Sequence, residues 1–89
     1  MKGEISWVRR TEDGKVQVFA KHVGNRWLFF AREKRFDDWQ AVEKPPLEDW
    51  LELLDSVQRR IARRLVKPEQ EAHVKKTIRE RFPDWLEGE

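Results

Sequence analysis

Two short turn signals, eleven residues apart, constrain the first half of this chain more than any other feature. Asp13-Gly14 and Gly24-Asn25 are dipeptides typical of two-residue hairpin loops, because glycine and asparagine accept the positive φ angles that such loops require. Apolar and polar residues alternate on both sides of each signal, which favours half-buried strands. The pattern predicts three antiparallel strands, and a short fourth strand can continue them after a turn near Phe36. Their expected ranges are residues 4–12, 15–23, 26–34 and 39–43.

The predicted loops also determine which strand residues lie opposite each other. Two-residue loops place Val8 opposite Phe19, and Phe19 opposite Phe30. Side chains alternate between the two faces of a sheet, so this register assigns every strand residue to one face. One face is almost wholly apolar and is expected to form the core. Its members are Ile5, Trp7, Val16, Val18, Ala20, Trp27, Phe29 and Ala31.

Two helices are predicted in the second half of the chain. After Pro45-Pro46, apolar residues recur at helical spacing and predict a helix over residues 47–65. Pro68 and Pro83 bracket a second helix over residues 68–82, whose buried line is Val74, Ile78 and Phe82. The apolar stripe of the first helix is Leu47, Trp50, Leu51, Leu54, Val57, Ile61 and Leu65.

Strands followed by helices predict an α+β fold. We expect a three- or four-stranded antiparallel meander with two α-helices packed on one face of the sheet, all within a single domain of residues 1–89. A three-stranded meander followed by a helix resembles, in topology alone, several small DNA-binding sheet domains, some of which read the major groove with strands. No motif of those domains matches this sequence, so no residue roles follow from the resemblance.

The face opposite the predicted core carries an unexpected apolar row. Val8, Phe19 and Phe30 form it, with Leu28 beside them. The cations around this row are Arg10, Lys21, Arg26 and Arg32. Aromatic rings among cations on a sheet can stack on bases while the cations contact phosphates, which predicts binding of single-stranded nucleic acid.

Two other interpretations of the same row stay open. It can be a minor second core, covered by Trp85-Leu86 near the C-terminus or by the segment around Trp39. It can also be the interface with another protein or a second copy of this chain, since apolar patches with polar rims mark such contacts.

Charge alternates in sign along the sequence although the net charge is only +2. Residues 56–68 carry five basic side chains and no acidic ones. Four of these are predicted to lie at the end of the first helix: Arg59, Arg60, Arg63 and Arg64. This second basic patch can contact phosphates or an acidic protein, or can simply complement the helix dipole. Residues 37–55 carry seven acidic side chains, Asp49 among them. No calcium-loop spacing is present, and charge runs usually form a solvated surface, so we expect a solvated acidic face.

Most enzyme classes lack their signatures in this sequence. There is no cysteine, which excludes thiol catalysis, disulfides and thiolate metal sites. His22 and His73 lack the spacing of a metal motif, and no nucleophile elbow or phosphate-binding loop is present. We therefore expect a non-enzymatic binding module with no metal, cofactor, small-molecule substrate or membrane partner. A cytoplasmic location is expected because cysteine and a signal region are both missing from the sequence.

Overall fold

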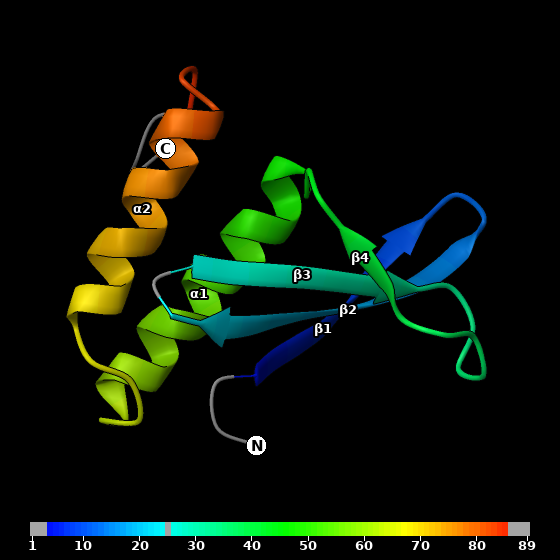
Figure 1. The fold of residues 1–89 in the computed structure, drawn as a ribbon, viewed down its shortest axis with the longest axis horizontal. Coiled ribbons are helices and arrows are strands. Elements are labelled where there is room, and N and C mark those ends of the chain that lie inside the picture. The colour runs from blue at the N-terminus through cyan, green and yellow to red at the C-terminus, as the bar shows by residue number, and fades with distance from the viewer. Residues whose placement is uncertain (1–3, 25, 86–89) are drawn as a thin grey trace. The chain divides into compact units, whose positions relative to one another are not determined.

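Four strands and two helices follow one another along the chain in the computed structural model, which describes residues 4–24 and 26–85 (Figure 1). The elements are β1 (Glu4–Thr11), β2 (Gly14–Val23), β3 (Arg26–Arg32), β4 (Gln40–Val42), α1 (Leu47–Ala62) and α2 (Glu69–Arg81). The α+β class, the short fourth strand and the two helices are thus confirmed. The chain divides into two compact units: Met1–Pro45 contains the strands, and Pro46–Glu89 contains the helices.

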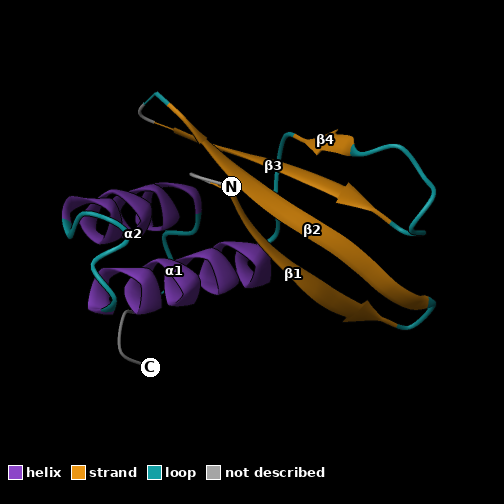
Figure 2. Cartoon of the chain, turned by 90° about the horizontal axis from the view of Figure 1, so that it is seen from below, coloured by secondary structure: helices purple, strands orange, loops and turns teal. Residues whose placement is uncertain are grey.

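The strands form one antiparallel sheet in the order β1-β2-β3-β4 (Figure 2). The hairpin of β2 and β3 has the predicted register, because Val23 pairs with Arg26 and Phe19 pairs with Phe30. Gly24 begins its loop with a φ of 60°, in the left-handed region that glycine tolerates. Asn25, the other predicted loop residue, lies outside the described residues.

The first hairpin turns one residue earlier than predicted. Its loop consists of Glu12 and Asp13, and Thr11 pairs with Gly14. Gly14 has a φ of 137°, and the Thr11 hydroxyl donates a hydrogen bond of 3.2 Å to the Gly14 carbonyl oxygen. Glycine therefore follows the loop instead of occupying it. The Asp13-Gly14 signal predicted the hairpin but misplaced the loop, because the strained position comes just after the turn.

This earlier loop moves the pairing of β1 with β2 by two residues. Val8 lies opposite Gln17 instead of Phe19, so the predicted Val8–Phe19 pair is wrong. A shift of two residues keeps each side chain on its predicted face, because side chains alternate with a period of two. The apolar face is therefore the one that the sequence predicted. Ile5, Val18, Ala20 and Phe29 are buried in it, and Trp7, Val16, Trp27 and Ala31 are half-buried.

A tight turn connects β3 to the segment before β4. The backbone N–H of Asp37 donates to the Lys34 carbonyl oxygen at 3.0 Å, and the Lys34 N–H donates to Asp37 Oδ2 at 3.2 Å. These two hydrogen bonds close the turn from both sides. Phe36 lies within it and is 94% exposed.

The first helix buries a face slightly rotated from the predicted one. Trp50, Leu54 and Val57 are buried as predicted, but Leu53 is also fully buried. Asp49 is 2% exposed, so its predicted place on a solvated acidic face is wrong. Leu53 follows Asp49 by four residues, and residues at that spacing share a helical face. Burial of Leu53 therefore brings Asp49 into the same buried side.

The first helix ends at Ala62, three residues before the predicted end. A residue with left-handed backbone, Arg64, follows it and stops the helix. The Arg64 N–H donates to the Ile61 carbonyl oxygen at 2.9 Å, and the Leu65 N–H donates to the Arg60 carbonyl oxygen at 2.8 Å. This is the hydrogen-bond pattern of a Schellman turn, in which glycine usually occupies the left-handed position. Arg64 occupies it here with a φ of 61°.

Arg64→Gly is expected to raise the free energy of unfolding by about 0.5–1 kcal/mol, because relief of the left-handed strain exceeds the added freedom of the unfolded chain. Urea denaturation followed by circular dichroism measures this change. Arg63→Gly is the matched control: Arg63 has a φ of −93°, so glycine there should lower stability. Equal effects of the two substitutions would show that the backbone of Arg64 is not strained.

The second helix agrees closely with its prediction. It spans Glu69–Arg81, with Val74 and Ile78 fully buried and Phe82 half-buried just beyond it. Gln58 of α1 donates a hydrogen bond of 2.9 Å to Glu71 of α2, and Lys75 lies 3.1 Å from the same carboxylate. These two groups hold the pKa of Glu71 below its ordinary value. Within the described part of the chain, no helix is long and apolar enough to span a bilayer.

Candidate functional site

The sheet face opposite Ile5 and Val18 combines aromatic and cationic side chains, and we call it the aromatic–basic face. Alternation along the strands places five cations on it, from three strands. They are Arg10 of β1, Lys15 and Lys21 of β2, and Arg26 and Arg32 of β3. The first four are exposed and Arg32 is half-buried. Among the described β1–β3 residues of this face, Glu4 is the acidic member, so these strand residues together carry a net positive charge.

Three aromatic rings meet near the middle of this face, and we call them the aromatic cluster. Phe19 and Phe30 stack with ring centroids 4.8 Å apart and planes inclined by 15°. Trp39, the residue before β4, meets Phe19 edge-on, with centroids 4.8 Å apart and planes at 87°. The segment around Trp39 was one of the predicted covers for the apolar row of Val8, Phe19 and Phe30. In the structure, Trp39 contacts Phe19 of that row.

Stacking of Phe19 on Phe30 changes which ring is available to a ligand. Each phenyl face that contacts the other ring is occupied, and both residues are half-buried. Trp39 is 37% exposed and is therefore the most accessible ring of the cluster. Val8 pairs with Gln17 instead of Phe19 and is 54% exposed.

Arg32 connects the aromatic cluster to the strand beside it. Its Nε–H donates a hydrogen bond of 2.6 Å to Gln17 Oε1. Its guanidinium carbon lies 4.2 Å from the centroid of the Trp39 ring, a cation–π contact. The other cations predicted around the row are exposed, in contrast to the half-buried Arg32. They are Arg10, Lys21 and Arg26.

The second basic patch is not one helical surface. Arg59 and Arg60 lie in the last turn of α1, while Arg63 caps the helix and Arg64 lies beyond it. The prediction that all four belong to the helix is therefore wrong, because the Schellman turn ends the helix at Ala62. Arg59 pairs with Asp55, and that hydrogen bond raises the pKa of Arg59 above its ordinary value.

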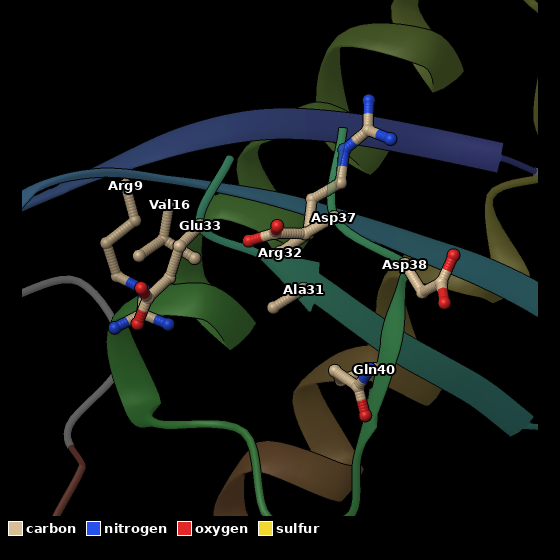
Figure 3. Close-up of a pocket in the computed structure, with 8 residues that line it drawn as sticks. All are labelled: Arg9, Val16, Ala31, Arg32, Glu33, Asp37, Asp38 and Gln40. Carbon is tan, nitrogen blue, oxygen red and sulfur yellow. The ribbon is translucent and has the colours of Figure 1, made fainter. Parts of the chain in front are cut away.

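Each unit contains an open hollow among the residues that the structure describes. The first, about 650 Å³, lies beside the turn between β3 and β4. Figure 3 shows the side chain of Arg32 pointing away from the neighbouring carboxylates of Asp37 and Asp38. The residues that line this first hollow are Arg9, Val16, Ala31, Arg32, Glu33, Asp37, Asp38 and Gln40. Sequence reasoning missed this hollow, because the segment 33–39 has no periodic pattern that would fold it against the sheet.

The second hollow, of about 640 Å³, belongs to the helical unit. Trp85, predicted as a possible cover for the apolar row, lines it together with Leu47 and Leu51. Leu86, its predicted companion, lies outside the described residues.

Neither histidine lies in a cluster of metal-binding side chains among the described residues. His22 packs against the Trp27 ring with centroids 4.8 Å apart. His73 is exposed on α2, where its carbonyl oxygen accepts a hydrogen bond from the Thr77 hydroxyl. Within residues 4–24 and 26–85, no three metal-binding side chains come together.

Comparison with known proteins adds nothing to this geometry. No protein-family model matches the chain, and neither the curated proteins nor the solved structures contain a match.

Proposed function

We propose that the aromatic–basic face binds single-stranded nucleic acid. The observation that carries this proposal is the position of the aromatic cluster among five cations on one sheet face. Aromatic rings on a sheet stack on unpaired bases, and neighbouring cations neutralise the phosphates between them. A duplex hides the faces of its bases, so a stacking surface favours single strands.

The different exposures of the side chains on this face support different roles in the proposed binding. Trp39, the most exposed ring, is the primary stacking surface, and Phe19 and Phe30 support it from the sheet. Arg10, Lys21 and Arg26 are exposed around the cluster, where they can contact phosphates.

A protein partner is the second candidate, and exposed aliphatic residues favour it. Val8, Val23 and Leu28 lie on the same face and are 54%, 43% and 37% exposed. A second copy of this chain is a poor occupant, because it would place its five cations against the same five cations. Like charges across an interface suppress association. A protein partner for this face would therefore be acidic.

Affinity for mixed-sequence single-stranded DNA and RNA should fall steeply as salt rises. With about four phosphates neutralised, the logarithm of the association constant is expected to fall with the logarithm of salt concentration with a slope of about −3. Fluorescence anisotropy with labelled oligonucleotides measures the slope, and amide chemical shifts locate the contact.

Shift changes centred on residues 17–21, 28–32 and 39 would support the proposal. Changes confined to residues 59–64 would contradict it and indicate attraction to the second basic patch. If no amide shifts change at low salt, the proposal is also contradicted, and an acidic protein becomes the favoured partner. Light scattering over a range of concentrations separately tests self-association.

A further inference from the structure

Gln17, Arg32 and Trp39 form a continuous row across the aromatic–basic face. Gln17 pairs with Arg32 in the ladder of β2 and β3. Ala31 pairs with Gln40, the first residue of β4, so Trp39 follows as the neighbour of Arg32 in the next row. One hydrogen bond and one cation–π contact join the three side chains in that order.

Trp39 depends on side-chain contacts for its orientation. The ladder between β3 and β4 covers only three pairs and ends at Gln40, so Trp39 is the first residue outside it. The Phe19 ring lies nearly perpendicular to the indole, and the Arg32 guanidinium lies over it. The short ladder thus leaves the most exposed ring of the cluster to be held by its neighbours.

Arg32 is held in turn by Gln17. The 2.6 Å bond from Arg32 Nε to Gln17 Oε1 fixes the guanidinium beside the indole. A guanidinium stacks on an aromatic face through its plane while its N–H groups donate in that plane, and this combination is not available to lysine. The exposed Arg10, Lys21 and Arg26 have no such arrangement among the contacts seen on this face.

We infer that Arg32 is a positioning residue for nucleobase stacking: with Gln17 it holds one face of the Trp39 indole, and the opposite face receives the base. This inference rests on the proposed function and divides the cations of the face into two kinds. Arg26 and its exposed neighbours act on phosphates, whereas Arg32 acts through Trp39. A ring already ordered before binding loses less conformational freedom when a base stacks on it.

Two glutamine variants separate these roles. Arg32→Gln and Arg26→Gln each remove one cation from the same face of β3. Two quantities are measured for each: the indole N–H resonance of Trp39 in the free protein, assigned with Trp39→Phe, and the salt dependence of binding to a mixed-sequence single-stranded DNA.

Arg32→Gln is expected to move the Trp39 resonance and to weaken binding roughly three- to tenfold, with the salt slope unchanged. Arg26→Gln should leave the resonance in place and make the slope shallower by about 0.7. Gln17→Met, which removes the acceptor at similar length, should move the Trp39 resonance as Arg32→Gln does. Arg32→Lys should not restore binding, because a lysine lacks the planar group.

The contrary results are equally distinct. An unmoved Trp39 resonance in Arg32→Gln would overturn the inference. Full rescue by Arg32→Lys, together with a slope loss of about 0.7 in Arg32→Gln, would also overturn it and make Arg32 a phosphate contact. Failure of the wild-type chain to bind any oligonucleotide would defeat the proposed function. The resonance of the free variants would still decide whether Arg32 orients the indole.

Discussion

Replacement of Trp50 by alanine is expected to lower the free energy of unfolding by about 3–5 kcal/mol, the largest stability effect in the chain. Trp50 is 3% exposed in α1, and the Arg81 guanidinium of α2 lies 5.5 Å from the centroid of its ring. Truncation removes a large apolar surface and leaves a cavity that the surrounding residues cannot fill. The loss also separates Arg81 from its aromatic contact.

Urea denaturation of the Trp50→Ala variant measures this loss as a lower transition midpoint with an unchanged slope. Leu65→Ala is the matched control, because Leu65 is 66% exposed and should change stability by less than about 0.5 kcal/mol. A Trp50→Ala variant as stable as the wild type would show that the buried face of α1 is assigned wrongly.

Trp39→Ala is expected to have the largest effect on binding. Loss of one stacked base costs about 1–3 kcal/mol, which corresponds to a roughly 5- to 150-fold weaker affinity for single-stranded nucleic acid. The substitution suits this test better than Phe19→Ala with Phe30→Ala. Those two phenyl rings are half-buried and stacked, so their removal also disturbs the sheet.

Phe36→Ala is the control for Trp39→Ala. Phe36 is 94% exposed in the turn before Trp39, so its removal is another loss of an exposed aromatic ring from the same segment. Anisotropy titrations of both variants with one oligonucleotide compare them directly, and circular dichroism checks the fold. Equal affinities of Trp39→Ala and the wild type would remove stacking from the proposal.

Local chemistry predicted most of the sheet, and its errors have identifiable causes. Turn signals and alternation predicted three strands and both faces and left a short fourth strand open, because these features depend on neighbouring residues. The predicted pairing of Val8 with Phe19 was wrong because a glycine can occupy either position of a two-residue loop or the position just after it. The sequence alone does not distinguish these three placements. In Gly14 the positive φ lies after the loop.

The candidate site was harder to predict than the strands around it. Phe19, Phe30 and the surrounding cations follow from strand alternation. The contact of Trp39 with Phe19, and the position of Arg32 against both Gln17 and Trp39, depend on the path of segment 33–39, which carries no periodic signal.

The prediction of the helices also depended on periodic apolar signals alone. The apolar spacing found α1 but missed the burial of Asp49, because a charged residue gives no apolar signal to a periodicity count.

The doubly closed turn around Phe36 makes this chain convenient for spectroscopy. Phe36 projects almost entirely into solvent from a turn with two hydrogen bonds, and the sequence contains no cysteine. A Phe36→Cys variant would thus carry a single thiol on a well-defined support three residues from Trp39. A dye attached there would report on ligands that approach the indole, without competing labels elsewhere in the chain.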